Sequence, residues 1–420
     1  MSPEIRFDKW NDLYAERTAA LKSSAIRDLF IVASRPDIIS FAGGMPDTRS
    51  LPIEIVIEAT KKVLQKEGPA ALQYGPSEGH LGLRKCVSKL MAENNMHVDT
   101  DEIIITDGGQ QALDLLGKIF INPKDNILVE GPSYVGAIQA FSSYQAKITS
   151  LPLDENGLLI DSLVQALEDL KKRNQKAKFI YLVPSFSNPT GITLSLERRK
   201  ALLKIIKKYD LLAIEDNPYD QLRFSEDKIP TLRSMDNSLI YMGTFSKIFS
   251  PGVRLGWVAA PKPIIEKLNF GKQAADLCSS SLTQRIVEEY FTSYPWEKYL
   301  KKQTELYKER RDVMLESLDK FFPSDAKWTK PGGGLFLWVT LPEFVNTAEM
   351  LAKSINEAKV AYVPGKAFFA DDNGKNCMRL NFSYPNKEQI SEGIKRLGKL
   401  IKSEIKLRQT FTDKLNLNND

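Results

Sequence analysis

The sequence predicts an α/β protein in which a large domain carries a mostly parallel sheet between helices and a smaller domain is of the α+β class. Between about residues 53 and 260, short and continuously apolar runs alternate with segments of helical spacing. Continuous apolar runs separated by helices are typical of parallel strands buried on both faces. A long helical pattern from about 284 to 321 then leads into a second set of mixed strands and helices. The chain of 420 residues is long enough for two or three packing units.

The elements of the large domain follow one another in a regular order. The first helix is predicted from Ile53, Val56, Ile57, Thr60 and Leu64, which keep helical spacing. Strands are predicted at 103–106, 127–130, 179–183, 211–215, 239–243 and 255–260, with helices between several of them near 110–120, 162–172 and 196–209.

The smaller domain is predicted from the elements that follow the connecting helix. Three glycines at 332–334 precede a strand at 335–340, a helix near 347–358, a strand near 378–384 and an amphipathic helix at about 387–407, and we expect the polar tail 409–420 to be frayed. We therefore expect an N-terminal segment (1–50) that joins the small domain, a large domain (51–300) and a small C-terminal domain (301–420).

Composition excludes several classes of function. The 58 basic and 53 acidic residues leave a formal charge of only +5, without a long basic block, so nucleic acid is not expected as a partner. Three scattered cysteines favour a reducing compartment, and two isolated histidines give no metal site. Without a signal core or a run of about 18 apolar residues, we expect a cytoplasmic protein that does not enter a membrane.

The segment around Lys247 is the most informative feature of the chain. It reads Thr-Phe-Ser-Lys-Ile-Phe-Ser-Pro-Gly-Val-Arg from residue 244 to residue 254. Apolar neighbours leave the amine poorly hydrated, which disfavours the ammonium and leaves a usable nucleophile. Such an amine can form a Schiff base with an aldehyde cofactor. Ser246 and Arg254 supply a hydroxyl and a guanidinium of the kind that holds a phosphate.

Polar motifs also follow other predicted strands, at the edge where ligands gather in open α/β sheets. A Gly-Gly turn at 108–109 precedes a helix, where backbone amides can close on an anion. Tyr134 can stack on a planar ring, and the sequences Ser-Asn-Pro-Thr-Gly and Glu-Asp-Asn-Pro-Tyr stand at 187–191 and 215–219. Each motif alone has an ordinary interpretation as a turn, a core aromatic or a solvated strand end. Their joint order, with Lys247 next, indicates a cofactor site.

This order of motifs resembles the pyridoxal-phosphate-dependent aminotransferases of fold type I, class I/II, over almost the whole chain. The matching motifs are Phe-Ala-Gly-Gly-Met-Pro-Asp, Tyr-Gly-Pro-Ser-Glu-Gly, Asn-Pro-Thr-Gly and Asp-Asn-Pro-Tyr, at 41–47, 74–79, 188–191 and 216–219, and the segment 247–257. The start of the chain is similar to the branch of 2-aminoadipate, kynurenine and aromatic aminotransferases. The resemblance implies a seven-stranded sheet in the large domain and pyridoxal 5′-phosphate as the cofactor.

The resemblance also implies a role for each cofactor residue. Lys247 would carry the cofactor as a Schiff base and then shuttle the proton of a 1,3-shift, because one amine can act as base and as acid. Asp216 would keep the pyridine nitrogen protonated, which makes the ring an electron sink. Tyr219 and Asn188 match hydrogen-bond donors to the phenolic oxygen. The other cofactor residues implied are Tyr134 on the ring, Gly109, Gln110, Ser246 and Arg254 at the phosphate, and Tyr74, which would reach the phosphate from the other subunit of a homodimer with shared active sites.

Substrate recognition is implied in the same way. Arg379, in Met-Arg-Leu-Asn-Phe at 378–382, matches the arginine that binds the substrate α-carboxylate, and a planar guanidinium suits that bidentate contact. Asn188 and the backbone of Gly44 match contacts to the substrate. Arg27 resembles an arginine that some members use for a distal acidic group, and a solvent-exposed Arg27 is the alternative.

The expected reaction is a ping-pong transfer of an amino group from an L-amino acid, such as 2-aminoadipate or an aromatic amino acid, to a 2-oxo acid such as 2-oxoglutarate. A carbon–sulfur β-lyase on the same scaffold is one alternative, because it would share every cofactor residue. The cofactor-binding sensor domain of a transcriptional regulator is another, although about forty residues before the first motif are few for a DNA-binding module and linker. The sequence leaves the donor, the acceptor and the pathway open.

Overall fold

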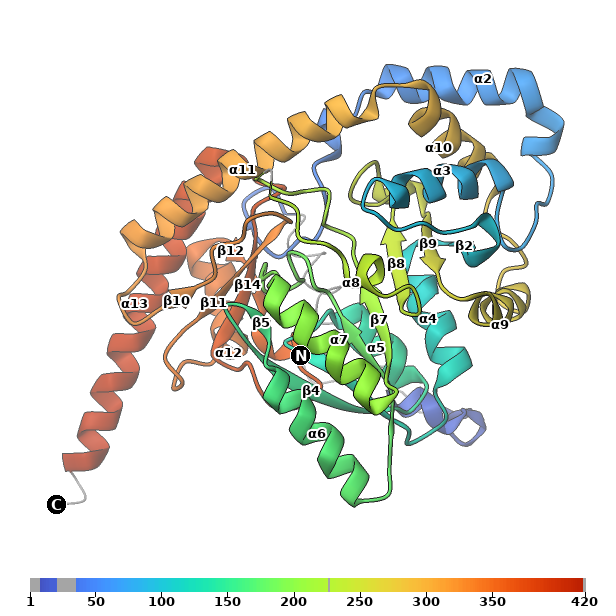
Figure 1. The fold of residues 1–420 in the computed structure, drawn as a ribbon. Helices are drawn as coiled ribbons and strands as arrows, with labels where there is room; N and C mark the ends of the chain where they lie inside the picture. The colour runs from blue at the N-terminus through green and yellow to red at the C-terminus, as the bar shows by residue number, and fades with distance from the viewer. Residues whose placement is uncertain (1–7, 21–34, 226, 418–420) are drawn as a thin grey trace.

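The computed structural model describes residues 8–20, 35–225 and 227–417, and it contains one large and one small sheet (Figure 1). The large sheet has the order β2-β9-β8-β7-β6-β3-β4-β5. Its strands are β2 (Ile103–Thr106), β3 (Asn126–Gly131), β4 (Lys147–Asp154), β5 (Gly157–Leu158), β6 (Ala177–Leu182), β7 (Leu212–Asp216), β8 (Ile240–Thr244) and β9 (Gly256–Ala259). Neighbouring strands from β8 to β4 are parallel, whereas β9 runs antiparallel to both β2 and β8.

Helices cover both faces of this sheet. Because successive strand residues point to opposite faces, Ile180 and Leu182 of β6 pack with the helices on one side, while Phe179 and Tyr181 pack with those on the other. The first side carries α6 (Ile160–Lys172) and α7 (Leu196–Tyr209), and also α3 (Leu81–Ala92), whose Leu90 and Met91 lie near Tyr241 and Trp257. The second side carries α4 (Gly108–Phe120), α5 (Val135–Ser143) and α9 (Lys262–Gln273). The α/β class and the mostly parallel sheet are therefore confirmed.

The strand count differs from the expected seven, because the sheet has eight strands. No strand was predicted at β4, whose residues Lys-Ile-Thr-Ser-Leu-Pro-Leu-Asp alternate in polarity and are mostly half-buried or exposed. The added edge strand β5 is only two residues long and pairs antiparallel with the end of β4. Both strands lie at one edge of the sheet, where burial on two faces, the signal used for the other strands, does not apply.

The small sheet has the order β10-β11-β14-β13, and a separate parallel pair joins β1 to β12. These strands are β1 (Ile39–Ser40), β10 (Lys327–Trp328), β11 (Phe336–Thr340), β12 (Val360–Ala361), β13 (Val363–Pro364) and β14 (Cys377–Asn381). β1, at residues 39–40, pairs with β12 near the C-terminal part of the chain, while the expected N-terminal segment 1–50 joining the small domain stays a prediction. The division at residues 50 and 300 stays a prediction.

Long helices connect the two parts. The expected connector 284–321 is two helices, α10 (Ser281–Ser293) and α11 (Trp296–Phe321), because Pro295 interrupts the pattern. In Figure 1, α11 runs from α10 and α2 (Ile53–Ala71) across to α13 (Lys387–Leu417), which continues well beyond the expected end at 407. The short helices α8 (Leu232–Met235) and α12 (Thr347–Lys353) complete the set, the latter continued by a π-helical turn at Ser354–Ala358.

Within the described residues, no helix is long and apolar enough to span a bilayer, and no cluster of three or more potential metal ligands is present.

Candidate functional site

The predicted site residues come together at the carboxyl edge of the large sheet. The ends of β2, β3, β6, β7 and β8 carry the polar motifs, and the antiparallel β9 begins at the same edge directly after Arg254. A cavity of about 370 Å³ opens there. Its lining includes all the predicted site residues except Tyr74 and Arg27, namely Gly44, Gly109, Gln110, Tyr134, Asn188, Asp216, Tyr219, Ser246, Lys247, Arg254 and Arg379.

Lys247 places its amine inside this cavity. Its neighbours Phe245, Ile248 and Phe249 are buried, and the Lys247 Nζ donates a hydrogen bond to the Gly44 carbonyl at 3.1 Å. Burial, followed by repulsion from Arg379 and Arg254, lowers the pKa of Lys247 to about 8, while Asp216 acts in the opposite direction. The amine is therefore easier to deprotonate than a surface lysine, as the apolar context of the sequence suggested.

Asp216 ends β7 and presents a buried carboxylate to the same cavity. Its Oδ2 accepts a 2.5 Å hydrogen bond from the hydroxyl of Tyr181. Burial raises the pKa of Asp216 to about 6, although Tyr181 and the positive charge of Lys247 favour ionisation. Among the described residues no cation forms an ion pair with it. A buried acid without a cation suits a ligand that brings a positive charge of its own.

The opposite end of the cavity suits an anion. Helix α4 begins at Gly108, and no side chain caps its first amides. Arg254 lies against this turn and donates from Nη2 to the Asp107 carbonyl at 3.2 Å. Gly108 has φ +73°, and a Cβ there would lie 2.7 Å from the Arg254 guanidinium, so the close approach depends on glycine. Free helix amides, Arg254 and the nearby hydroxyls of Ser246 and Thr244, 3.0 Å apart, can together bind a phosphate.

Position 109, the second residue of α4, is a glycine without a side-chain hydroxyl. A Cβ at Gly109 would meet no atom within 4 Å. The position is therefore open toward the cavity, and what it lacks is a hydroxyl, not space.

Arg379 reaches the cavity from β14 of the small sheet. Its Nη1 donates to Asn188 Oδ1 and its Nη2 to the Ala42 carbonyl, both at 2.9 Å, and its Cζ lies 4.2 Å from the centre of the Phe336 ring. Burial lowers the pKa of Arg379 to about 10, which leaves it charged at neutral pH. Its Nε has no hydrogen-bond partner. A buried donor without a partner suits a carboxylate entering from the cavity.

Tyr134 and Tyr219 complete the lining of the cavity. Burial raises the pKa of Tyr219 and the pKa of Tyr134, so both phenols stay protonated and can donate hydrogen bonds. The Tyr134 hydroxyl lies 3.5 Å from Gln110 Oε1, and Gln110 Nε2 donates to the Gly136 carbonyl at 3.0 Å. These contacts fix Gln110 beside the turn that carries Tyr134.

Two predicted site residues are not among those that line the cavity, and two relevant residues were not predicted. Tyr74 is 78% exposed and does not line the cavity, and Arg27 lies outside the described residues. Tyr181 was not predicted, because it sits in the apolar run of β6 and reads there as core. The one available signal was that a phenol with a buried hydroxyl needs a hydrogen-bond partner. Thr244, which lines the cavity three residues before Lys247, was not predicted either.

The charges of the cavity test whether the residues present fit pyridoxal phosphate. The ionisable groups other than tyrosines that line it are Lys247, Arg254, Arg379 and Asp216, which gives three positive charges against one negative charge. A phosphate at the α4 end and a substrate carboxylate at Arg379 would compensate this excess, and a protonated ring nitrogen would pair with Asp216. The residues therefore fit the cofactor.

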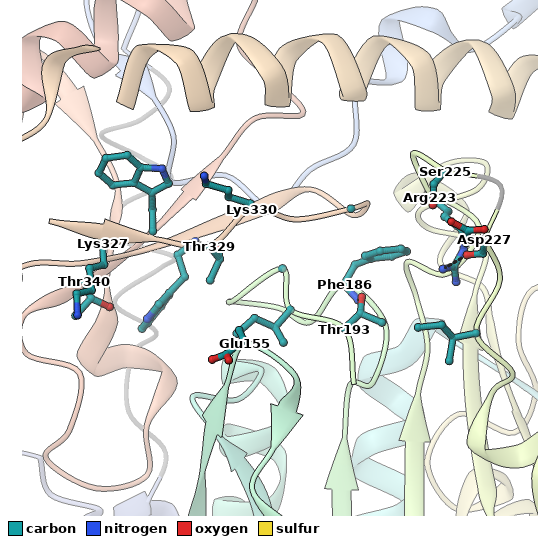
Figure 2. A pocket seen from close by; sticks show the side chains of 16 residues that line it. Glu155, Phe186, Thr193, Arg223, Ser225, Asp227, Lys327, Thr329, Lys330 and Thr340 are labelled. Atoms are coloured by element: carbon teal, nitrogen blue, oxygen red, sulfur yellow. Dashed lines mark hydrogen bonds between the residues drawn. The ribbon is translucent and has the colours of Figure 1, made fainter. Parts of the chain in front are cut away.

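A second and larger cavity lies away from Lys247. It measures about 670 Å³ and separates β10 and β11 from loops at the edge of the large sheet. Figure 2 shows Lys327, Thr329 and Thr340 on one side, and Glu155 and Thr193 on the other, with Phe186 between these loops and the loop of Arg223 and Asp227. Lys327, Lys330, Glu155 and Asp227 are exposed. Volume alone would select this cleft, but it holds neither a buried amine nor a buried acid without a cation.

Comparison with known proteins identifies the family of the chain. A family model described as aminotransferase class I and II matches residues 36–397. The aromatic-amino-acid aminotransferase 1 of Thermococcus litoralis is 44% identical over 408 residues, which cover 96% of this chain and 97% of the relative.

Two solved structures are also similar. The kynurenine aminotransferase of Pyrococcus horikoshii is 41% identical with a TM-score of 0.90, over 94% of this chain and 98% of that one. The α-aminoadipate aminotransferase of Thermus thermophilus, solved with N-(5′-phosphopyridoxyl)-L-leucine, is 36% identical with a TM-score of 0.87, over 95% of this chain and 100% of that one.

Proposed function

The chain belongs to the class I and II aminotransferases, and from this premise we propose that it transfers the amino group of an aromatic amino acid or 2-aminoadipate to 2-oxoglutarate. It is a pyridoxal-phosphate-dependent aminotransferase that moves an amino group between an amino acid and a 2-oxo acid. The specific donors and the acceptor belong to the proposal, which draws on the donors named for its relatives.

One observation carries the proposal. The buried amine of Lys247 shares a cavity with the buried Asp216, with the uncapped end of α4 and with Arg379, whose Nε lacks a partner. A β-lyase would need the first three of these features equally. The named relatives are aminotransferases, however, and do not favour a lyase.

Each residue would contribute a separate task. The cofactor supplies an aldehyde and a ring that withdraws electrons from the substrate α-carbon. Lys247 would hold that aldehyde and would then take the proton from the α-carbon and return it, since an amine whose pKa is about 8 can act as base and acid near neutral pH. Asp216, itself fixed by Tyr181, would hold a proton at the ring nitrogen. Tyr219 and Asn188 would donate to the phenolic oxygen, and Tyr134 would stack on the ring.

Substrate and phosphate would occupy opposite ends. Arg379 would bind the α-carboxylate and already contacts Asn188, with Gly44 beside it. The amides of Gly109 and Gln110, the hydroxyl of Ser246 and the guanidinium of Arg254 would bind the phosphate. Arg27, outside the described residues, would bind the distal carboxylate of 2-aminoadipate.

We also propose a homodimer with shared active sites, in which Tyr74 completes the phosphate site of the partner subunit. The segment of Tyr74 and the segment that includes Gln273 carry large apolar side chains at high exposure: Leu72 (71%), Phe270 (59%) and Leu277 (51%). A hydrogen bond of 3.1 Å from Gln273 Nε2 to Ser77 Oγ holds the two segments together. Exposed apolar residues grouped in this way are typical of protein interfaces. A cytoplasmic location is proposed in addition, in line with three free cysteines.

A panel of L-amino acids assayed against 2-oxoglutarate tests the reaction and its specificity. We expect glutamate to form with 2-aminoadipate and with aromatic donors. Without a 2-oxo acid acceptor, the reaction should stop after a single turnover. Steady release of pyruvate from a β-substituted amino acid without any 2-oxo acid would instead identify a lyase. For Arg27→Ala, a lower kcat/KM for 2-aminoadipate with unchanged activity on leucine supports distal recognition, and equal losses on both substrates contradict it.

A further inference from the structure

Behind the turn that begins α4 lies a lysine with no contact to solvent. Lys272, on α9, has a fully buried side chain, and it does not line either cavity described above. A buried ammonium is unfavourable unless hydrogen-bonded acceptors compensate it. Lys272 therefore lies buried directly behind the turn of the proposed phosphate site, and none of the roles described above accounts for it.

The acceptors of Lys272 form a compact group. Its Nζ donates to both carboxylate oxygens of Asp276, at 2.8 and 2.6 Å, and to Gln111 Oε1 at 3.2 Å. Gln111 Nε2 donates to Asp276 Oδ2 at 2.7 Å, which closes the triangle. Although burial opposes ionisation, these hydrogen bonds, together with one to the side chain of Asp107, lower the pKa of Asp276. The amide of Gln111 can therefore occupy only one orientation, with its oxygen toward Lys272.

This orientation determines what Gln111 offers to the turn. The same Oε1 accepts a hydrogen bond from the backbone N–H of Asp107 at 2.8 Å, and the carbonyl of Asp107 accepts one from Arg254 at 3.2 Å. A continuous series of hydrogen bonds thus runs from Lys272 through Gln111 and Asp107 to Arg254. Asp107 immediately precedes the two glycines at the start of α4.

We propose that Lys272, together with Asp276, is a positioning residue for the cofactor phosphate: it fixes Gln111, which fixes the turn that aims the first amides of α4 and Arg254. Lys272 does not contact the cavity, so its effect is indirect. The inference rests on the proposed role of that turn in binding phosphate, and it adds residues that no sequence motif marked.

The test compares the binding of pyridoxal 5′-phosphate with that of pyridoxal, which lacks the phosphate. Both react with the same amine, so the ratio of their dissociation constants for the apoprotein isolates the phosphate contribution. We expect Lys272→Met to weaken pyridoxal phosphate binding by about tenfold or more, as is usual when a residue that orients a binding group is lost. Pyridoxal binding should change less than about twofold, because the ring site is untouched. Lys272→Arg, which keeps the charge, should restore part of the preference.

Controls make the result decisive. Lys267→Met, on the same helix but exposed, should leave both constants unchanged. Equal weakening of both ligands by Lys272→Met, or no weakening of either, would overturn the inference. If that variant does not fold, Gln111→Leu is read in the same way, because it keeps the Lys272–Asp276 pair and removes the acceptor of the Asp107 backbone N–H. If the wild-type protein itself shows no preference for the phosphorylated ligand, the proposed phosphate site is wrong and the inference falls with it.

Discussion

The two cavities of this protein differ in whether their charged side chains are buried or exposed to solvent. In the smaller one, Asp216 and Arg379 are buried and Lys247 is half-buried, and their pKa values are shifted to about 6, 10 and 8. In the larger cleft, the lysines and Glu155 are exposed at the rim. The first arrangement is costly for the folded protein in the absence of a ligand, because charged groups lose water without gaining full compensation. The second has no such cost.

This difference is more informative than size. The larger cavity has nearly twice the volume, about 670 Å³ against about 370 Å³, and yet it offers no chemistry that solvent-exposed side chains do not offer elsewhere. Perturbed acids and bases gathered in one cavity are typical of catalytic sites. Substitutions in the two places should therefore have very different consequences.

The largest difference is expected between two lysines. Lys247→Ala should reduce kcat by more than about 10⁴-fold, since one amine serves as the attachment point and as the proton carrier. Lys327→Ala, in the cleft, should leave kcat within about twofold, the usual result for an exposed residue away from the chemistry. Steady-state transamination kinetics of both variants check this. A comparable loss in both would mean that the cleft takes part in the reaction.

The next largest effect is expected at Arg379. Arg379→Leu should lower kcat/KM for amino acid donors by about 10²- to 10³-fold, because a buried charged contact to the α-carboxylate is lost. A primary amine without that carboxylate serves as the matched substrate, and its slow reaction should be unaffected. Equal losses of kcat/KM for the amino acid and for the primary amine would show that Arg379 acts on the fold and not on the carboxylate.

The pKa of Lys247 predicts how the apoprotein captures its cofactor. Below pH 8 most of the amine is protonated, so the rate of capture should rise about tenfold per pH unit and level off above about pH 8. Stopped-flow absorbance after mixing with pyridoxal phosphate measures it. A rate that keeps rising to about pH 10 would indicate a solvated lysine.

A smaller effect, on stability alone, is expected at the turn beside the cleft. A Cβ on Gly333 would lie 2.6 Å from the Leu222 carbonyl and from the Phe186 ring, whereas one on Gly332 would meet Phe186 at 3.7 Å. Gly333→Ala should lower the free energy of unfolding by about 1–3 kcal/mol through overpacking, and Gly332→Ala should change it by less than about 0.5 kcal/mol. Denaturant unfolding of the two apoproteins compares them. Equal stabilities would mean that the turn moves aside without cost.

The smallest effect is expected for charges at the cleft rim. The double variant Glu155→Ala/Lys330→Ala should keep kcat/KM within about twofold and the free energy of unfolding within about 0.5 kcal/mol. Kinetics and denaturant unfolding of the double variant test both values. A clear loss of activity would assign a function to the cleft and would remove the contrast between the cavities.

Much of the smaller cavity was predictable from the sequence, and the reasons are local. The strands buried on both faces gave continuous apolar runs, and the residues that follow them, such as Asn188 and Asp216, necessarily meet at one edge of a parallel sheet. β4 was missed because its polar alternation reflects a place near the sheet edge. The helical spacing on both sides of Pro295 predicts a single long helix, whereas the proline itself marks the break between α10 and α11.

The supporting residues could not be predicted, for a different reason. Tyr181 reads as one more apolar position of β6, and only its distance to Asp216 shows its role. Lys272 reads as one of several lysines on α9, and its pairing depends on Gln111, far away in the chain. Residues that act through long-range hydrogen bonds carry no local pattern, whereas residues that contact a ligand tend to sit in short motifs at strand ends.

Reduction of the purified protein with borohydride, followed by peptide mass mapping, tests the central assignment most directly. If Lys247 is the residue that holds the cofactor, the phosphopyridoxyl mass will be found on the peptide that contains position 247 and will be absent from peptides that contain Lys272 or Lys327. A label on another lysine, or no label at all after incubation with pyridoxal phosphate, would contradict the account.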